Sequence, residues 1–600
     1  MQNIYLSNVD LSEALQKYKS YITPFASKTE TIPVSQALNR TTAQAIFALC
    51  NSPLYDCAAM DGIAVISEKT KTAREIVPIT LRQGDFIPAD TGDPILPPYD
   101  AVIMVEDVQL TTSGAIIRKA AVSYQHIRAI GEDVVKGELI IPSDHSIRPV
   151  DIGALLSGGV TEIIVNAIPK VGIIPTGTEL VDPYQKAPVV SKIIETNSYM
   201  LEALIKEDNC LAERYPIIPD DYIQLKAALQ SAVKNNDIVL ICSGTSAGRE
   251  DYTKQLLEEL GEVVVHGLAI KPGKPAILAV VDGKPVIGVP GYPVSAYIVY
   301  QNIVSTLLNP KQAPAEITAT LAKRLVSSPK HMEFVRVKVG EIDGRYIAAP
   351  LPRGAGASMS LVNADGFCII DKNLEGIEAG SQVKITLLRN LDEITQTLIS
   401  IGSHDIIMDV LADILPLSSS HVGTMGGLMA LKRHECHIAP IHHLDEVSGE
   451  YNIPILKQMF VGEKVVLIKG VKRVQGIMVA KGNPLNIMGL ADLTRCRYVN
   501  RSRGTGTRMF LDYKLKESEI LVENINGYER EASTHMNVGS IITSGGADAG
   551  LGVLSAALAC GLDFIPIGEE DYDFAVYAYT LDRAGEFIDT LKSEKFHGRK

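Results

Sequence analysis

Apolar and polar positions alternate along this chain in two distinct patterns, and the first begins at residue 171. Apolar runs of strand length start at 171 (VGII), 213–218 and 237–242, and each is followed by a helical pattern, at 195–207, 221–234 and 251–260. The segment AILAVV-DG-KPVIGV predicts a hairpin with Asp282 and Gly283 in a type I′ turn. Strands that alternate with helices in this way predict an open, doubly wound α/β sheet.

The rest of the chain follows other patterns. Residues 9–21 predict an amphipathic helix, residues 50–145 contain short strands among many Gly and Pro residues, and residues 316–388 alternate as an all-β segment. A second α/β pattern runs from about residue 396 to the end. The predicted multidomain α/β architecture comprises an elongated N-terminal domain (1–50 with 145–170), a β-rich module (51–144), a doubly wound α/β domain (171–314), a β-barrel-like domain (315–390) and a two-lobed α/β domain (396–600).

Length and composition fit this division. A chain of 600 residues is too long for one core. The formal net charge of −13 argues against general nucleic-acid binding, which neutralises phosphates with Lys and Arg. The eight cysteines are scattered without a C-x-x-C pair, as is typical of a reducing compartment. The N-terminus shows no signal-peptide pattern, and no apolar run reaches the roughly 18 residues of a membrane helix, so a cytoplasmic protein is expected.

Acidic side chains follow the predicted strand ends of the first α/β unit. Glu179 lies in IIPTGTEL, Asp220 in IIPDD, and Asp251 closes LICSGTSAGRED. Loops at the carboxyl ends of neighbouring parallel strands lie side by side, so these three carboxylates can converge. Converging carboxylates are suitable ligands for Mg²⁺.

The same edge also offers groups that suit a phosphate. Lys271 and Lys274 in KPGKP supply positive charge, and the backbone N–H groups of a small-residue loop can surround an anion. The loop residues are Ser243, Gly244, Thr245, Ser246 and Gly248. Any one of these loops alone is better explained by solvated carboxylates and turn-forming glycines. Together they favour a phosphorylated substrate handled with the help of a metal ion.

Seven motifs occur in an order that resembles one known family. They are SPLYDCAAMDGIAV from residue 52, DTGDPILPPYDAVIMVED from 90, GEDV from 131, then TGTEL, DYTK, KPGKP and PGYPVSA. In this order they resemble the molybdopterin molybdotransferase family, known as MoeA in bacteria and as the E domain of gephyrin in animals. The resemblance covers residues 1 to about 390.

The resemblance implies an enzyme that inserts molybdate, or tungstate, into adenylylated molybdopterin with the help of Mg²⁺ and releases AMP. It implies a homodimer whose site is shared between subunits, and a molybdopterin adenylyltransferase as a protein partner. Glu179, Asp220 and Asp251 are the implied metal ligands. The further implied site residues are Asp61, Thr91, Asp133, Lys271, Pro290 and Pro293, with Ser358 or Ser360 from the β domain.

The chain departs from the family pattern at four positions. Ala58 replaces a serine, Ile63 an aromatic residue, Tyr292 an asparagine, and Gly267 a lysine that is often present. The carboxylate positions are intact, which favours an enzyme over the alternative, a non-catalytic cofactor-binding or scaffold protein of the gephyrin type.

The C-terminal 200 residues resemble the type II periplasmic-binding-protein fold, as in the substrate domains of LysR-type regulators. Small-residue motifs (GSHD, SSSHVGTMGG, NRSRGTGTR and SGGADAGLG) lie near its predicted strand-to-helix turns. The hydroxyl and N–H donors of two of these turns suit an oxyanion or a pterin ligand between lobes. The donor residues are Ser418, Ser419, Ser420, Arg503, Thr505 and Thr507; the alternative is that they are ordinary helix caps.

A group of histidines and a cysteine also lies in this region, at residues 434, 436, 437, 442 and 443. Its spacing fits no standard zinc site, so the sequence does not favour a metal there.

Overall fold

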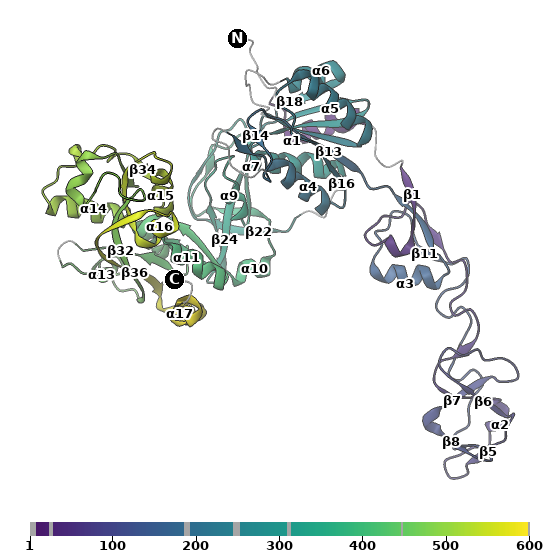
Figure 1. Ribbon diagram of the computed structural model, residues 1–600. Coiled ribbons are helices and arrows are strands. Elements are labelled where there is room, and N and C mark those ends of the chain that lie inside the picture. Colours follow the sequence, from purple (N-terminus) through teal and green to yellow (C-terminus); the bar gives the residue numbers. More distant parts are fainter. Residues whose placement is uncertain are drawn as a thin grey trace.

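A computed structural model describes residues 8–22, 28–184, 192–243, 252–308, 314–445 and 448–597. The chain is elongated, with the β-rich module at one end and the C-terminal domain at the other (Figure 1). No helix within the described ranges is both long and apolar enough to cross a membrane.

The first α/β unit is built on a six-stranded sheet in the order β16-β13-β17-β21-β20-β18. The strands β16 (Leu211–Arg214), β13 (Lys170–Pro175), β17 (Ile238–Ser243) and β21 (Lys284–Pro290) are parallel, and β20 (Ile277–Val281) runs antiparallel to both of its neighbours, β21 and β18 (Glu262–His266). One face packs on α1 (Leu11–Tyr21), α4 (Asn197–Glu207) and α7 (Pro293–Val299). The other face packs on α5 (Tyr222–Asn235) and α6 (Thr253–Leu260), so both faces of the sheet are covered.

The structure confirms the predicted hairpin and moves several element boundaries. Asp282 and Gly283 both have positive φ angles, 51° and 73°, as a type I′ turn requires. The strand expected at 213–218 is instead Leu211–Arg214. After β16 the chain pairs with the loop that follows β13 at one isolated bridge, between Thr176 and Ile218.

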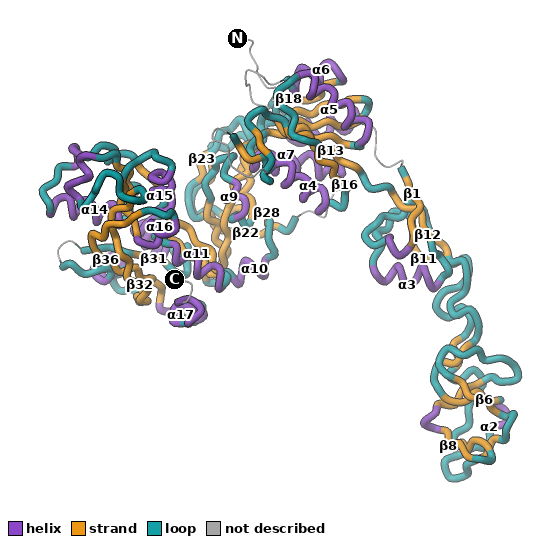
Figure 2. The backbone as a smooth tube through the Cα atoms, in the orientation of Figure 1, coloured by secondary structure: helices purple, strands orange, loops and turns teal. Residues whose placement is uncertain are grey.

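The N-terminal region forms two small bodies beyond the α/β unit. In the first, β1 (Thr29–Pro33) pairs with β12 (Glu162–Asn166), and α3 (Pro149–Ser157) packs beside them. The second is the β-rich module, in which β4 (Gly62–Val65) lies between β6 (Phe86–Ala89) and β7 (Ala101–Met104). A further sheet of β5 (Ile79–Leu81), β9 (Gly114–Ile117) and β8 (Val108–Thr111) completes the module (Figure 2).

The β domain closes into a barrel-like sheet. Its order is β19-β24-β25-β22-β28-β26, and β26 also pairs back to β24. The strands are β19 (Ile270–Lys271), β22 (Glu316–Leu321), β24 (Met332–Ile342), β25 (Arg345–Pro350), β26 (Gly366–Ile370) and β28 (Gln382–Leu387). Because β19 comes from the KPGKP segment, the α/β unit and the barrel share a strand pairing at Lys271.

The C-terminal domain has two lobes joined by two 15-residue strands, β32 (Val465–Val479) and β36 (Asp563–Tyr577). The first lobe holds β29 (Leu398–Gly402), β30 (Leu417–His421), β31 (Ala439–Ile441), α11 (Ile406–Ile414) and α12 (Gly423–Lys432). The second lobe holds β33 (Tyr498–Arg501), β34 (Glu531–Ala532), β35 (Ala549–Val553), α14 (Gly506–Glu517) and α15 (His535–Thr543). The first lobe meets the barrel directly, since a Cβ at Gly340 of β24 would lie 2.2 Å from Cγ1 of Ile399.

Candidate functional site

Two loops at the carboxyl edge of the α/β sheet are bonded to each other. The backbone N–H of Thr178 donates to Oδ2 of Asp220 at 3.0 Å, and the N–H of Asp220 donates to the Thr178 hydroxyl at 3.1 Å. The carboxylate of Glu179 folds back over Gly177, where a Cβ would lie 2.9 Å from either oxygen. Gly177 has φ +150°, which favours glycine and permits this approach. The arrangement places two acidic side chains side by side on one edge.

The third acidic loop falls outside the described residues. Asp251, Gly244, Thr245, Ser246 and Gly248 lie there, as does the side chain of Ser243. Within the described ranges, no group of three His, Cys, Asp or Glu side chains is placed to hold a metal ion.

The lysines of KPGKP lie where the sheet meets the barrel. Nζ of Lys271 lies 3.8 Å from Oε1 of Glu333, a buried carboxylate that Arg353 approaches at 3.1 Å. Burial and then the charges of Lys274 and Lys271 lower the pKa of nearby His331. Both lysines therefore lie close enough to His331 to act on its charge, beside the sheet edge.

A second set of predicted residues gathers at the start of α7. Pro290 ends β21, Pro293 is the first residue of α7, and the N–H of Val294 donates to the carbonyl of Ala355 at 3.1 Å. Ser358 begins α9 (Ser358–Val362) just beyond, exposed, while the hydroxyl of buried Ser360 donates to the carbonyl of Ala357. The barrel thus brings its RGAGAS loop, residues 353–358, onto the α/β domain.

Asp61 and Thr91 are held together in the β-rich module. The N–H and the hydroxyl of Thr91 donate to Oδ1 of Asp61 at 2.7 and 2.6 Å, and these bonds lower the pKa of this exposed carboxyl. The N–H of Asp133 donates to the carbonyl of Ser52 in the same module. Within one chain this module stands apart from the α/β domain, so it does not bring these residues to Glu179 and Asp220 (Figure 1).

The predicted ligand residues of the C-terminal domain occupy several environments. Ser418 and Ser420 line a small cavity against Lys338 and Gly340 of the barrel, and the Ser419 hydroxyl is a buried group without a partner. Arg503 is 71% exposed and pairs with Glu529 at 2.5 Å. Thr505 precedes α14 and donates to the carbonyl of Ser502, whereas buried Thr507 accepts from the amide of Gln475.

The histidine group near residue 440 is dispersed. His434 bonds Tyr579, His437 accepts the N–H of Ile399, and His442 bonds Glu570 at 2.9 Å. These side chains serve separate contacts rather than one metal ion.

Sequence reasoning missed several polar residues that the fold brings to these sites. At the first site, Lys192 donates to the carbonyl of Thr178, and Asn197 donates to the carbonyl of Gly291. The buried Oδ1 of Asn197 has no partner within the described ranges. In the C-terminal domain, the missed residues are Arg473 and Arg501, with His404 and His535. No spacing in the sequence links these residues, although Arg501 and His404 lie inside motifs that the sequence singles out.

Comparison with known proteins identifies the first two thirds of the chain. A protein of Methanocaldococcus jannaschii named for molybdopterin biosynthesis is 34% identical over 378 residues, which cover 60% of this chain and 93% of that relative. This chain belongs to the MoeA family. Family models match it as the MoeA N-terminal region (domain I and II) over residues 9–159, a probable molybdopterin binding domain over 172–310, and the MoeA C-terminal region (domain IV) over 318–388.

Two further MoeA relatives agree. The molybdopterin molybdenumtransferase of Haemophilus influenzae is 28% identical over 397 residues, covering 61% of this chain and 96% of its own length. The crystal structure of the molybdopterin biosynthesis MoeA protein from Pyrococcus horikosii matches with 31% identity and a TM-score of 0.53, covering 64% of this chain and all of that one. A PBP superfamily domain matches residues 411–592. The resemblance and the multidomain α/β class predicted from the sequence are thereby confirmed.

Proposed function

We propose that this MoeA-family chain is a molybdopterin molybdotransferase that inserts molybdate, or tungstate, into adenylylated molybdopterin and releases AMP. The observation that carries the proposal is the bonded pair of Thr178 and Asp220 with Glu179 beside it, at the carboxyl edge of a parallel sheet. Ligands of open α/β sheets bind at this edge. The names of the relatives, which refer to molybdopterin biosynthesis and molybdenum transfer, support the same chemistry.

The proposed roles follow from charge and position. Glu179 and Asp220, together with Asp251, would hold Mg²⁺, since hard carboxylate oxygens are the ligands that this ion prefers. The bound ion would supply positive charge to the phosphoanhydride of the substrate. Lys271 and Lys274 neutralise the phosphate of the departing AMP. Pro290 and Pro293 shape the turn into α7, which the RGAGAS loop with Ser358 and Ser360 covers.

The residues of the β-rich module enter the site from a second copy of the chain. The module that carries Asp61, Thr91 and Asp133 also exposes large apolar side chains close to them in the sequence, as expected of a surface that pairs: Leu54 (63% exposed), Tyr55 (47%), Met60 (46%) and Leu96 (63%). We therefore propose a homodimer with a shared site, built from the five domains at the boundaries that the sequence predicts. A molybdopterin adenylyltransferase is the proposed partner, because its product is the substrate.

An assay of AMP release from adenylylated molybdopterin, with molybdate and Mg²⁺, tests the reaction. We expect release that depends on both ions. A correctly folded chain that binds the pterin but releases no AMP would support the non-catalytic, gephyrin-like alternative instead.

Mixing two inactive variants tests the shared site. Asp61→Asn and Asp220→Asn chains, each inactive alone, should regain about one quarter of the activity after subunit exchange, because half of the dimers are mixed and each mixed dimer holds one intact site. No recovery from chains that sediment as mixed dimers would contradict the shared site.

The C-terminal domain is a second ligand-binding unit in this proposal, for an oxyanion or a pterin. Buried polar atoms without partners at the junction of its lobes support this role, because natural folds satisfy nearly all such atoms.

A further inference from the structure

Arg501 is a buried cation without a counter-charge. It ends β33 with only 4% of its surface exposed, and its one guanidinium hydrogen bond, from Nη1, goes to the carbonyl of Ala532. Its Nε has no partner, and no ion pair in the described part of the chain involves it. A buried charge is costly unless it is paired, so this guanidinium indicates a missing anion.

Arg473 is the charged group that acts most strongly on Arg501, while the carboxylates of Asp405 and Asp409 act on the neighbouring His404 and His421. Burial and the charge of Arg473 lower the pKa of Arg501 to about 10. Arg501 in turn contributes to the lowered pKa values of His404, His421 and His535. Arg473 differs from it, because Arg473 is matched by Asp405 at 2.8 Å and by Glu570.

Two of these imidazoles have a nitrogen available. Nδ1 of His535, a residue only 2% exposed, and Nδ1 of half-buried His404 have no hydrogen-bond partner among the residues that the structure describes. The two rings lie 6.2 Å apart, one from each lobe, and the exposed ring of His421 lies 4.5 Å from His404. Each neutral imidazole in the appropriate tautomer offers one N–H donor.

Helix starts also point toward this junction. His404 directly precedes Asp405, the N-cap of α11, and His535 is the first residue of α15. The N-terminus of a helix carries partial positive charge and favours an anion. In α11 this position is already occupied by the Asp405 carboxylate, which accepts the N–H of Ile407, so only α15 adds to the field of Arg501.

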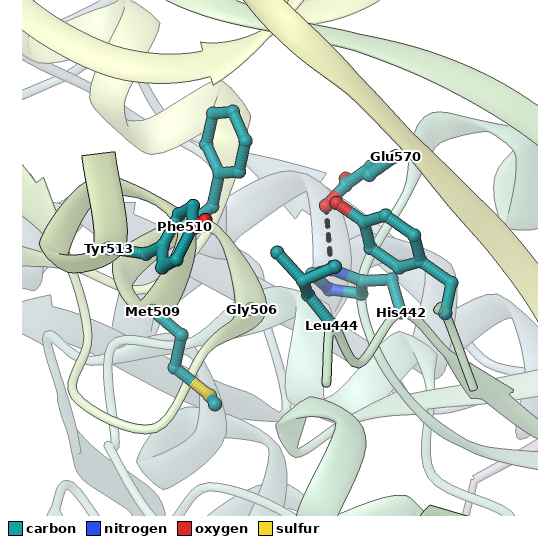
Figure 3. A pocket seen from close by; sticks show the side chains of 8 residues that line it. His442, Leu444, Gly506, Met509, Phe510, Tyr513 and Glu570 are labelled. Carbon is teal, nitrogen blue, oxygen red and sulfur yellow. Dashed lines mark hydrogen bonds and ion pairs between the residues drawn. The ribbon is translucent and has the colours of Figure 1, made fainter. Parts of the chain in front are cut away.

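A small cavity lies between His442 and α14. It is lined by His442, Glu570 and the α14 residues Gly506, Met509 and Phe510, and has a volume of ≈ 10 Å³ (Figure 3). Figure 3 shows the bonded pair of His442 and Glu570 facing α14 across it. None of Arg501, His404 and His535 lines this cavity, so the anion site that these three residues indicate is distinct from it.

We propose that the lobe junction of the C-terminal domain binds a small tetrahedral oxyanion, with Arg501 as its counter-charge and His404 and His535 as donors. The inference rests on the proposal that this domain binds a ligand, and it names the class. A metal cation is disfavoured because the buried Arg501 guanidinium would repel it. Arg503, the arginine that the sequence favours, is excluded from this role, since it is exposed and paired with Glu529.

Isothermal titration of the full chain with molybdate, sulfate and inorganic phosphate tests the proposal. We expect at least one of them to bind, and Arg501→Gln to weaken that binding about tenfold or more, since it removes a charged hydrogen-bond donor. Arg503→Gln is the matched control, two residues away, and should bind as the unmodified chain does. Equal binding by Arg501→Gln and Arg503→Gln, or no binding of any of the three anions, would overturn the proposal.

Two further measurements complete the test. If circular dichroism shows that Arg501→Gln is unfolded, His535→Gln replaces it, and anion binding should weaken by the same factor. A simple phosphate monoester distinguishes the source of the anion: binding weaker than that of inorganic phosphate supports a free inorganic anion, and tighter binding indicates a phosphate group on a larger ligand. If Zn²⁺ binds saturably and the Arg501→Gln variant binds it more tightly, the anion assignment is overturned.

The AMP-release assay measures a different site, so a failure of the proposed transferase reaction and a failure of this anion site are distinguishable.

Discussion

The two candidate sites of this protein are built in opposite ways. At the edge of the α/β sheet, Glu179 and Asp220 lie at the surface and are positioned by backbone N–H groups and a threonine hydroxyl. At the lobe junction, Arg473 and Arg501 with His442 and Glu570 are almost fully buried. The first site therefore has its charged groups in water before a ligand arrives, and the second has already removed them from water.

This difference determines how much each site contributes to folding and how much to activity. A surface carboxylate contributes little to folding, so changing it should alter activity alone. A buried ion pair is part of the fold, and removing one partner leaves the other as an unpaired buried charge. The first two predictions compare these two kinds of site and the next two test how the C-terminal domain is attached and buried, in order of decreasing expected effect.

The largest effect is expected for the buried pair. Glu570→Gln leaves the buried Arg473 with only Asp405 and should cost about 3–5 kcal/mol of the stability of the C-terminal domain. Its calorimetric transition should then move to a clearly lower temperature. Glu529→Gln removes an exposed pair with Arg503 and should cost under about 1 kcal/mol. Similar losses for both variants would abolish the contrast between the sites.

Asp220→Asn should affect catalysis but not folding. We expect AMP release to fall by about 100-fold or more, because the carboxylate acts on charge that develops in the reaction. Asp221→Asn is the matched control: Asp221 caps α5 through the N–H of Gln224, and asparagine caps equally well. Its activity and melting temperature should both stay unchanged. A wild-type rate for Asp220→Asn would remove this residue from the proposed site.

Gly340→Ala tests how closely the C-terminal domain is attached to the barrel. The new Cβ would lie 2.2 Å from Cγ1 of Ile399, so the Ile399 side chain must move and the domain contact must loosen, at a cost of about 1–3 kcal/mol. Limited proteolysis should then cleave the segment after β28 more rapidly. In Gly585→Ala, the control at the start of α17 (Gly585–Lys592), the added methyl group meets nothing within 4 Å, and the cleavage rate should not change.

A small effect of pH is expected in the C-terminal domain. Burial lowers the pKa values of His404 and His437 to about 4, below the roughly 6.5 of an unfolded histidine. The unfolded chain then binds protons more tightly, so this stability is complete above pH 6.5 and is lost as the pH falls toward 4. The melting temperature should drop by a few degrees, roughly, between pH 7 and 5. His437→Asn should reduce the drop, and an unchanged slope would contradict this cause.

The sequence predicted the elements of the α/β sheet well because local signals specify them. Alternation and caps place α5 and α6 within two residues of the expected ranges, and Asp282-Gly283 identifies the hairpin. The loops that carry Glu179 and Asp220 were also predictable, since parallel strands place their carboxyl ends together.

The lobe junction could not be predicted in the same way. His404 and His535 are separated by 131 positions and meet only through the topology of the two lobes. Arg501 and Arg503 look alike in the sequence; only the end of β33 at Arg501 decides which one is buried. Burial of a charged group depends on tertiary packing, and no spacing rule carries that information.

The course of β32 and β36 has a consequence for the history of the fusion. The chain enters the first lobe at β29, crosses to the second lobe along β32, and returns along β36 to finish at α17 in the first lobe. The second lobe is thus an insertion within the first, and Gly340 of the barrel contacts only the first. Exchanging residues 480–562 for those of another two-lobed domain would leave the attachment to the MoeA portion untouched, so ligand preference can diversify by grafting without disturbing the rest of the protein.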